Sequence, residues 1–474
     1  MRMVRGHVLP AAAAAIACAF ACAFGCNAVL GLDNFRGCAA NECDGGAGGG
    51  DSAADGPPVS VSCQTGADCV ASNAGVLCSQ NKCASVTRLA RGMSSFECAV
   101  LSDGTARCWG ADQAGQLGYD HVSPTSIATP HTVLDANGQP MTGIQDVTLG
   151  YDFACALRLM GGSTSVWCWG TSQGGGGQTK PQPVSLSNAA VLQVSAANDS
   201  ACALVSGTAG NEVFCWGTNG NGKMGCDNGL SCEEGGAPSP YTATLQVPRK
   251  LPSVNEPAYL ANGLYALCIG FSFSGFVDCY GTDGWGNLGD GTASVNSCCA
   301  QSSPQPGLPS KLIALQGSDF YTCAQDDNKD WFCWGGNLGQ GCALLNGCSD
   351  LHQPTSLDIG AGGRILNLST GWRHACAITP NGRGVWCWGQ NDHGQVGNGT
   401  LVGANVGPTQ TQLPAAAQPA QDIAAHRHWT CALGADGQVY CWGQNGDQND
   451  STPWLLGVGS TSGDVLVPTR VSWE

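Results

Sequence analysis

Cysteine is the residue of this sequence with the most chemistry to offer, because paired cysteines can form a disulfide or bind a metal ion. The chain has 474 residues and 29 cysteines. Fourteen of these recur as seven close pairs, and turn residues such as Asp103-Gly104 or Asp436-Gly437 separate the two members. One spacing repeated around one kind of turn favours disulfides over metal sites. The predicted bridges are Cys98–Cys108, Cys155–Cys168, Cys202–Cys215, Cys268–Cys279, Cys323–Cys333, Cys376–Cys387 and Cys431–Cys441.

Other patterns with catalytic potential are weak. Gly170-Thr-Ser-Gln-Gly174 matches the nucleophile motif G-x-S-x-G. Ser172, however, occupies a repeat position at which small polar residues bond their own turn. Its counterparts are Asp112, Asn219, Asp283, Asn337, Asn391 and Asn445. His426 and His428 alternate along a predicted strand and would share a face, but the sequence places no third metal ligand near them. We therefore predict no catalytic residue, cofactor or metal, and an exported hydrolase is the least favoured function.

The cysteine pairs belong to a longer repeat. Phrases such as Trp429-Thr-Cys-Ala-Leu433 and Tyr440-Cys-Trp-Gly443 occur together seven times, and the first cysteines of successive copies lie 47 to 66 residues apart. Each copy has the pattern of a β-hairpin whose two cysteines lie opposite each other. Repeats of this length built from short strands are typical of a propeller with one blade per repeat. The sequence predicts an all-β, seven-bladed β-propeller with disulfide-bridged hairpins.

At these residues the chain resembles the regulator-of-chromosome-condensation repeat family, in its bacterial exported lipoprotein type. Cys108 to Gly118 reads C-W-G-A-D-Q-A-G-Q-L-G, and Cys387 to Gly397 reads C-W-G-Q-N-D-H-G-Q-V-G. The resemblance covers residues 85–474, although the family histidine is retained only as His374 and Tyr280 replaces one tryptophan. The repeated tryptophans are most simply interpreted as structural wedges between blades: Trp109, Trp169, Trp216, Trp334, Trp388 and Trp442.

The resemblance also implies which functions are to be expected. It implies a rigid ring that offers variable loops to a protein or glycan. Guanine-nucleotide exchange, the activity of the eukaryotic prototype, is the alternative, but it requires a cytosolic GTPase. Gly371-Trp-Arg-His374 is similar to a phrase that carries light-sensing tryptophans in a plant photoreceptor; with a single copy, light sensing is not expected.

The ends of the repeat array suggest how the ring closes. Most repeats contain a proline-led strand, such as Pro130–Val133 or Pro354–Leu357, before a further strand and the hairpin. The array lacks this strand at its start and ends on it, at Val467–Val471. We therefore expect the C-terminal strand to complete the N-terminal blade, which would leave no exposed sheet edge there.

The N-terminal segments have the features of an exported protein. Residues 1–25 have Arg2, Arg5 and a long apolar run, which predicts a lipoprotein signal peptide with lipidation at Cys26. Cys18 and Cys22 are competing sites, and secretion without lipid is the alternative. Residues 26–58 read as a flexible Gly/Ala/Asp tether. Residues 59–84 read as a small module stapled by disulfides among four cysteines, with zinc as the alternative and the connectivity open: Cys63, Cys69, Cys78 and Cys83.

The remaining cysteines also divide into pairs. Cleavage before Cys26 and its lipidation would leave an even number, 26, for 13 disulfides. The further expected pairs are Cys38–Cys43, Cys226–Cys232, Cys342–Cys348 and the adjacent Cys298 and Cys299. So many cysteines in even number predict an oxidising location: the cell envelope, in the outer membrane or periplasm, or the extracellular medium.

The net charge and the loop lengths limit the class of partner that the chain is expected to bind. The net charge of −16 excludes nucleic acid and leaves the lipid anchor as the only membrane contact expected. Four long insertions follow the same phrase of the repeat and should project from one face of a monomeric ring: 226–248, 289–309, 339–354 and 398–419. The candidate contacts for an unknown protein or glycan are Tyr241, Leu344, Leu345 and Leu401.

Overall fold

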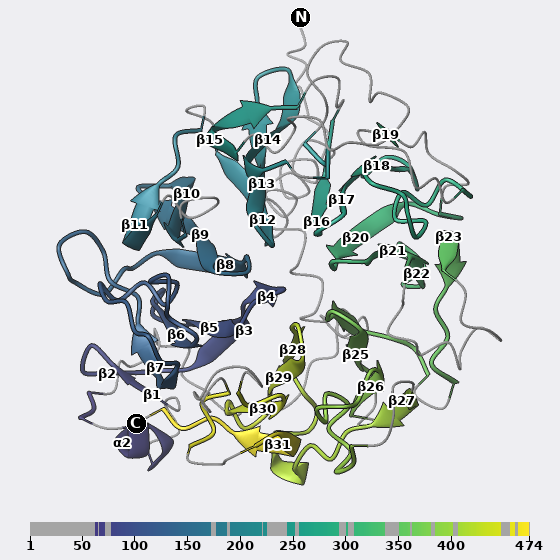
Figure 1. Ribbon diagram of the computed structural model, residues 1–474. Helices are drawn as coiled ribbons and strands as arrows, with labels where there is room; N and C mark the ends of the chain where they lie inside the picture. Colours follow the sequence, from purple (N-terminus) through teal and green to yellow (C-terminus); the bar gives the residue numbers. More distant parts are fainter. Residues whose placement is uncertain are drawn as a thin grey trace, which may run out of the picture. The chain divides into compact units, whose positions relative to one another are not determined.

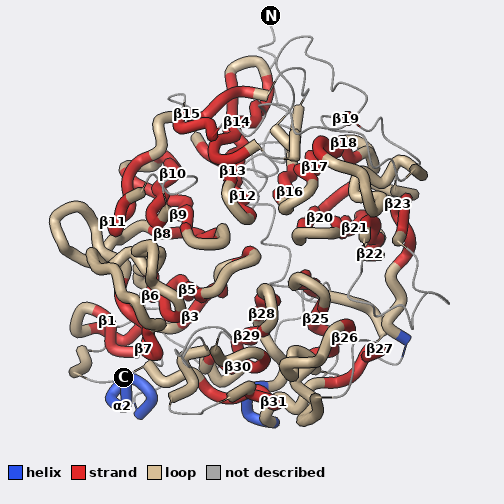
Figure 2. Tube along the Cα trace, in the orientation of Figure 1, coloured by secondary structure: helices blue, strands red, loops and turns tan. Residues whose placement is uncertain are grey.

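The computed structural model describes residues 62–64, 66–71, 77–171, 177–186, 190–219, 221–224, 244–251, 256–292, 300–301, 308–336, 350–360, 363–380, 384–401, 406–446, 456–459 and 463–473. All of them belong to the unit Gly48–Glu474. Seven antiparallel sheets of this unit stand around a common centre (Figure 1). Short strands and loops make up nearly all of the ring (Figure 2). The prediction of an all-β, seven-bladed propeller is confirmed.

Each blade has four strands, which follow one another from the centre of the ring to its rim in the order of the chain. The innermost strands are β3 (Val86–Leu89), β8 (Ile144–Leu149), β12 (Val191–Ala197), β16 (Tyr259–Asn262), β20 (Leu312–Gly317), β24 (Asn367–Thr370) and β28 (Asp422–Ala425). The second strands are β5 (Phe96–Leu101), β9 (Phe153–Met160), β13 (Ser200–Gly207), β17 (Ala266–Gly270), β21 (Tyr321–Asp326), β25 (His374–Ile378) and β29 (Trp429–Leu433).

The two outer positions follow the same order. The third strands are β6 (Ala106–Gly110), β10 (Ser163–Gly170), β14 (Gly210–Thr218), β18 (Val277–Gly281), β22 (Trp331–Gly335), β26 (Val385–Gly389) and β30 (Val439–Gly443). The outermost strands are β7 (Ile127–Thr132), β11 (Gln178–Pro183), β15 (Thr244–Lys250), β19 (Ala300–Gln301), β23 (Leu351–Ser356), β27 (Val406–Gln410) and β31 (Val465–Arg470). A short strand, β4 (Arg91–Gly92), pairs in parallel with β8, and a 3₁₀ turn, η3 (Ala415–Ala417), follows β27.

The predicted exchange of a strand between the two ends of the chain is wrong. β31 pairs with β30 of its own blade, and the first blade is complete as β3-β5-β6-β7. The proline-led strand therefore ends the blade of the preceding hairpin and does not begin the next blade. Its position explains its composition, because proline lacks the N–H that a central strand must donate and is tolerated on an edge. Six of the outermost strands contain proline: Pro130, Pro181, Pro248, Pro354, Pro408 and Pro468.

All seven predicted hairpin disulfides are present. In each hairpin the two cysteines are direct partners in the register of the second and third strands. Their Cα atoms are 4.1 Å apart, and their sulfur atoms are 2.04–2.13 Å apart. The cysteines are buried, so the bridges lie within the blades. The predicted pairs at 38–43, 226–232, 342–348 and 298–299 lie outside the described residues.

The repeated tryptophans lie between blades, as predicted. Trp169 and Trp442 are fully buried, and each indole Nε1 donates to a main-chain oxygen of the preceding blade at 2.8 Å. The acceptors are Gln116 and Gln395. A Cβ on Gly118 would lie 2.7 Å from the Trp169 ring, so this position requires glycine. The Trp-Gly phrase of one blade and the Gly-Gln-Leu-Gly phrase of its neighbour are thus two sides of one contact.

Hydroxyl groups link neighbouring innermost strands near the centre of the ring. In each case the hydroxyl oxygen accepts a hydrogen bond from a main-chain N–H of the next blade. The pairs are Thr148 with Ala196 (3.0 Å), Ser195 with Asn262 (3.1 Å) and Ser369 with Ala425 (2.8 Å). These bonds satisfy N–H groups that face the gap between two sheets and have no strand partner.

The first and last blades close the ring through buried charged and aromatic side chains. His426 Nε2 lies 2.7 Å from Glu97 Oε2, and both side chains are fully buried. Nδ1 of the same histidine lies 2.8 Å from the main-chain oxygen of Gly92. Asp422 accepts from the N–H of Leu89 (2.9 Å), and at the rim Trp109 packs edge-on against Trp473. Side-chain contacts therefore join the blades where no strand is shared.

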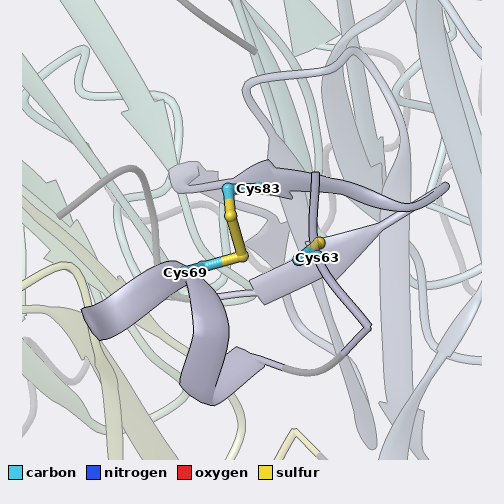
Figure 3. Close-up of side chains that lie close together, drawn as sticks. All are labelled: Cys63, Cys69 and Cys83. Carbon is cyan, nitrogen blue, oxygen red and sulfur yellow. A yellow bond between two sulfur atoms is a disulfide. The ribbon is translucent and has the colours of Figure 1, made fainter. Parts of the chain in front are cut away.

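A small module precedes the first blade. It contains α2 (Gly66–Ala71), β1 (Leu77–Ser79) and β2 (Lys82–Ala84), and disulfides join Cys63 to Cys78 and Cys69 to Cys83. In the described part of the chain, the only three potential metal ligands that cluster within 4.8 Å are the sulfurs of Cys63, Cys69 and Cys83 (Figure 3). Each of these sulfurs is already bonded to another sulfur, which favours the disulfide reading over zinc.

Candidate binding face

The strand order determines which connections share a face of the ring. In a four-stranded antiparallel blade, the link between the first and second strands and the link between the third and fourth leave from the same end of the sheet. We call the first set the AB turns and this side of the ring the AB face. The four long insertions all begin between a third and a fourth strand, so they leave from the AB face. The hairpin turns leave from the opposite face.

The AB turns are short and joined to one another. The N–H of Gly371 donates to the main-chain oxygen of His374 at 2.8 Å, and equivalent bonds close other AB turns. The N–H of Trp372 donates to His426 O in the turn of the next blade (3.2 Å). A Cβ on Gly371 would lie 2.5 Å from that oxygen, so only glycine permits the two turns to approach this closely. The turns thus hold their outer side chains on a fixed backbone.

Five of these outer side chains form an alternating series that we call the arginine–aromatic ladder: Tyr151, Arg427, Trp372, Arg373 and Phe320. The guanidinium carbon of Arg427 is 5.3 Å from the ring centroids of both Tyr151 and Trp372. The guanidinium carbon of Arg373 is 4.5 Å from the ring centroid of Trp372 and 6.0 Å from the ring centroid of Phe320. These distances are typical of cation–π contacts, which fix the plane of a guanidinium. The ladder draws on the AB turns of four blades.

Further aromatic rings extend the ladder at its Phe320 end. Tyr265 and Trp285 pack against each other and against Phe320, with centroids 4.8–5.6 Å apart. His428 packs edge-on against Trp372, the central ring of the ladder, at 4.9 Å, so only the Phe320 end is extended by further aromatic rings. Tyr151 and Trp285 are 37% and 38% exposed, which is high for aromatic side chains in a structured region. Tyrosine, tryptophan and arginine are the residues enriched at the energetic centres of protein interfaces.

Buried charges lie among the same turns. Burial raises the pKa of Asp319 to about 6, although Lys223 and Arg427 oppose the shift. Burial and the neighbouring Asp199 raise the pKa of Asp152 to about 6 as well. Burial lowers the pKa of the Lys223 ammonium to about 8, and this group donates to the main-chain oxygen of Gly263. The AB face therefore combines outer guanidinium groups with partly desolvated carboxylates.

The two histidines singled out from the sequence do not share a strand face. They lie in the AB turn between β28 and β29, where the chain reverses, so the predicted alternation along a strand is wrong. His426 points into the closing contact with Glu97, whereas His428 packs against Trp372 and His393. Burial lowers the pKa of His428 to about 4, and the nearby His393 and Arg427 contribute, so this imidazole is neutral at pH 7. The two rings have separate partners.

The small polar residue of each repeat bonds its own turn, as predicted. The side-chain oxygen accepts from the main-chain N–H five residues ahead in Asp112, Asn219, Asp283 and Asn391, at 2.8–3.2 Å. Asn445 accepts from Leu456 N–H at 3.3 Å. Ser172 and Asn337 lie outside the described residues. The repeat thus explains these positions by turn geometry.

The binding residues predicted from the sequence remain predictions. Tyr241, Leu344 and Leu345 lie outside the described residues, and so does Cys26. Leu401 is described and is 51% exposed on the connection that follows β26. Sequence reasoning missed the ladder because its members come from turns far apart in the chain. One signal was available: each lies just before the second-strand phrase that carries the first cysteine.

Comparison with known proteins gives the same fold. Residues 365–395 and 384–433 match family models described as the regulator of chromosome condensation (RCC1) repeat. The ultraviolet-B receptor UVR8 of Arabidopsis thaliana is 26% identical over 383 residues, which are 78% of this chain and 78% of that protein. The probable E3 ubiquitin-protein ligase HERC4 of Homo sapiens is 26% identical over 226 residues, 46% of this chain but 20% of that protein.

Two solved structures are similar in fold. Human WBSCR16 has a TM-score of 0.61 at 19% identity, covering 77% of this chain and 93% of that one. Prp20p of Saccharomyces cerevisiae was solved in a study of its binding to Gsp1p and histones. Its structure has a TM-score of 0.60 at 17% identity, and the match covers 87% of this chain and 90% of that one. At these identities the likeness shows the fold alone. The chain is therefore an RCC1-like seven-bladed propeller, with matches to the RCC1 repeat over residues 365–433.

Proposed function

We propose that this chain is a non-enzymatic scaffold outside the cytoplasm, tethered to the cell envelope, that binds another protein through its AB face. The observation that carries the proposal is that the blades are rigidly fixed, whereas the AB face presents side chains suited to binding. Disulfides, tryptophan wedges and turn glycines fix the blades, while on one side of the ring aromatic and arginine side chains from several blades contact one another in a continuous series. The variable insertions leave from the same side, so a partner could contact both.

Capture of partners with a matched pair of variants tests this function. Full-length mature protein would be the bait in extracts of the cell envelope, as wild type, as Trp285→Ala and as Phe273→Ser. Trp285 lies on the AB face, whereas Phe273 is 75% exposed on the hairpin turn of the same blade at the opposite face. We expect the partner to be lost with Trp285→Ala and retained with Phe273→Ser. Loss with Phe273→Ser alone would contradict the proposal, and capture of a glycan would change the partner's class.

The recognition loops have their own expected outcome. Shortening two of the insertions at 226–248, 289–309, 339–354 and 398–419 should abolish partner capture, because these are the parts of the repeat free to vary. The deletions should spare the outermost strands β15, β19, β23 and β27, which overlap these ranges, and the melting temperature should then stay near that of the wild type. Capture that survives every such deletion but fails on changes at the opposite face would contradict this assignment.

Two features support the proposed location. Nine disulfides among the described cysteines indicate an oxidising environment. No helix in the described residues has the length and apolar character needed to cross a membrane.

A lipid on Cys26 would supply the tether. Metabolic labelling with a fatty-acid probe should mark the wild type and be lost in Cys26→Ala. Labelling retained in Cys26→Ala would move the site to Cys18 or Cys22, and an unlabelled wild type would leave simple secretion.

A further inference from the structure

We propose that the arginine–aromatic ladder binds an acidic segment of the partner polypeptide, with side-chain carboxylates pairing with Arg373 and Arg427. This inference rests on the proposed function and adds the chemistry of the partner. It starts from an imbalance of charge. The chain carries −16 overall, yet in its described part neither of these arginines has a carboxylate within ion-pair distance. Other cationic side chains do form ion pairs with carboxylates, for example Arg88 with Asp146 at 3.3 Å.

Among the described residues, the two arginines make few hydrogen bonds through their guanidinium groups. A guanidinium carries five N–H donors. Arg427 uses Nη1 to donate to the Tyr151 hydroxyl at 3.0 Å. The Nε of Arg373 is buried and has no hydrogen-bond partner in the described structure. Both arginines are half-buried, so a bound acceptor would pair with the N–H groups at the exposed edge of each guanidinium.

The ladder also prepares the guanidinium groups for a planar acceptor. Stacking against Trp372 restricts the side chains, which reduces the conformational entropy that binding would otherwise cost. A carboxylate can accept two parallel hydrogen bonds from the edge of a guanidinium. The exposed rings of Tyr151 and Trp285 lie on the same face and offer contact area for apolar residues that flank an acidic side chain. The surface therefore suits a mixed acidic and apolar peptide.

The surrounding charges favour a polypeptide over a nucleic acid. Asp152, Asp199 and Asp319 lie in the neighbouring AB turns and would repel a phosphate backbone or any other unbroken run of negative charge, whereas a peptide can place single carboxylates at the arginines and apolar residues elsewhere. Asp319 also lies near enough to Arg427 for the guanidinium to lower its pKa, but it is not paired with it. A separate partner with a few spaced carboxylates meets these limits.

Peptide binding by the full-length mature protein tests the inference. The probes are a fluorescein-labelled peptide of alternating glutamate and phenylalanine and its matched glutamine analogue, followed by anisotropy at low and high salt. We expect the glutamate peptide to bind more tightly and to weaken with salt. The double variant Arg373→Glu/Arg427→Glu should lose at least about tenfold in affinity, the lower range for charge-assisted hydrogen bonds. Lys311→Glu/Arg364→Glu, which changes the net charge equally at the opposite end of the blades, should bind as wild type.

A conservative variant and an oligomer measurement make the test decisive. Arg373→Lys/Arg427→Lys keeps the charge but loses the planar fork, so its affinity should fall between the wild type and the glutamate variant. Three results would each overturn the inference. The first is equal binding of the two peptides, and the second is an equal loss of affinity in both charge-reversal variants. The third is sedimentation that shows a dimer which only Arg373→Glu/Arg427→Glu dissociates. If Trp285→Ala still abolishes partner capture in that case, the proposed function stands without it.

Discussion

Full reduction of the protein is expected to unfold the propeller at ordinary temperature. Each hairpin bridge closes a loop of 10–13 residues and is buried in its blade. In the chain-entropy estimate a bridge of this span contributes about 2–3 kcal/mol. Seven of them together contribute on the order of 15–20 kcal/mol, more than the total stability of about 5–15 kcal/mol typical of globular proteins. The measurement is thermal unfolding followed by circular dichroism, with and without a thiol reductant.

A single bridge provides the matched control. Replacing Cys431 and Cys441 together by alanine should cost about 2–3 kcal/mol in the free energy of unfolding and leave the ring assembled. Thiol counting on unfolded but unreduced protein should find few free cysteines. A reduced protein that melts at the temperature of the oxidised one, or a high free-thiol count, would contradict both the stabilising role of the bridges and the oxidising location.

Substitution of Glu97 is expected to change how the stability of the ring depends on pH. Burial raises the pKa of this carboxyl above its ordinary value near 4.5, and the contact with His426 offsets only part of the shift. The folded protein therefore holds a proton at pH values at which the unfolded chain has released it. This contribution is fully present below the ordinary pKa and is lost as the pH rises through the raised value. Wild type should thus lose stability relative to Glu97→Gln as the pH rises, by up to about 1.4 kcal/mol per pH unit.

The difference between the two proteins isolates this effect. Other shifted groups of the ring, such as Asp319 and His428, titrate equally in both and cancel. Denaturant unfolding at several pH values between 4.5 and 8 gives the two profiles. Glu97→Ala removes the partner of a buried imidazole and should cost about 3–5 kcal/mol. Parallel profiles for wild type and Glu97→Gln would show that the carboxyl does not titrate in this range.

The repeat and its hairpins could be predicted because their causes are local. A turn such as Asp103-Gly104 brings Cys98 opposite Cys108, and the same phrase seven times over specifies seven blades. The assignment of strands to blades failed because a proline-led strand between two hairpins can pair with either one. The edge preference of proline does not resolve this, because the first and the fourth strand of a blade are both edge strands and Pro130 would be tolerated at either place.

The ladder could not be predicted from local pattern. Tyr151 and Arg427 are 276 residues apart, and their contact exists only because the ring brings the second and last blades to the same end. Each residue lies just before a second-strand phrase, which marks it as a turn residue but does not specify which turns contact each other across the ring. The same holds for Glu97 and His426, since a histidine in a turn gives no indication of a buried carboxylate 329 residues away. Contacts between blades depend on closure of the ring, which periodicity does not specify.

The pairing order of the cysteines has a consequence for how the protein is made. In every described hairpin the bridged cysteines follow each other directly along the chain, and each blade is built from one continuous segment. An oxidase acting on the chain as it emerges would form the correct bridge from the nearest free thiol, blade after blade. The small module differs, because Cys63 pairs with Cys78 and Cys69 with Cys83, so each bridge skips a neighbouring thiol. Correct oxidation there requires either folding before pairing or a disulfide isomerase, and these cysteines emerge before those of any blade.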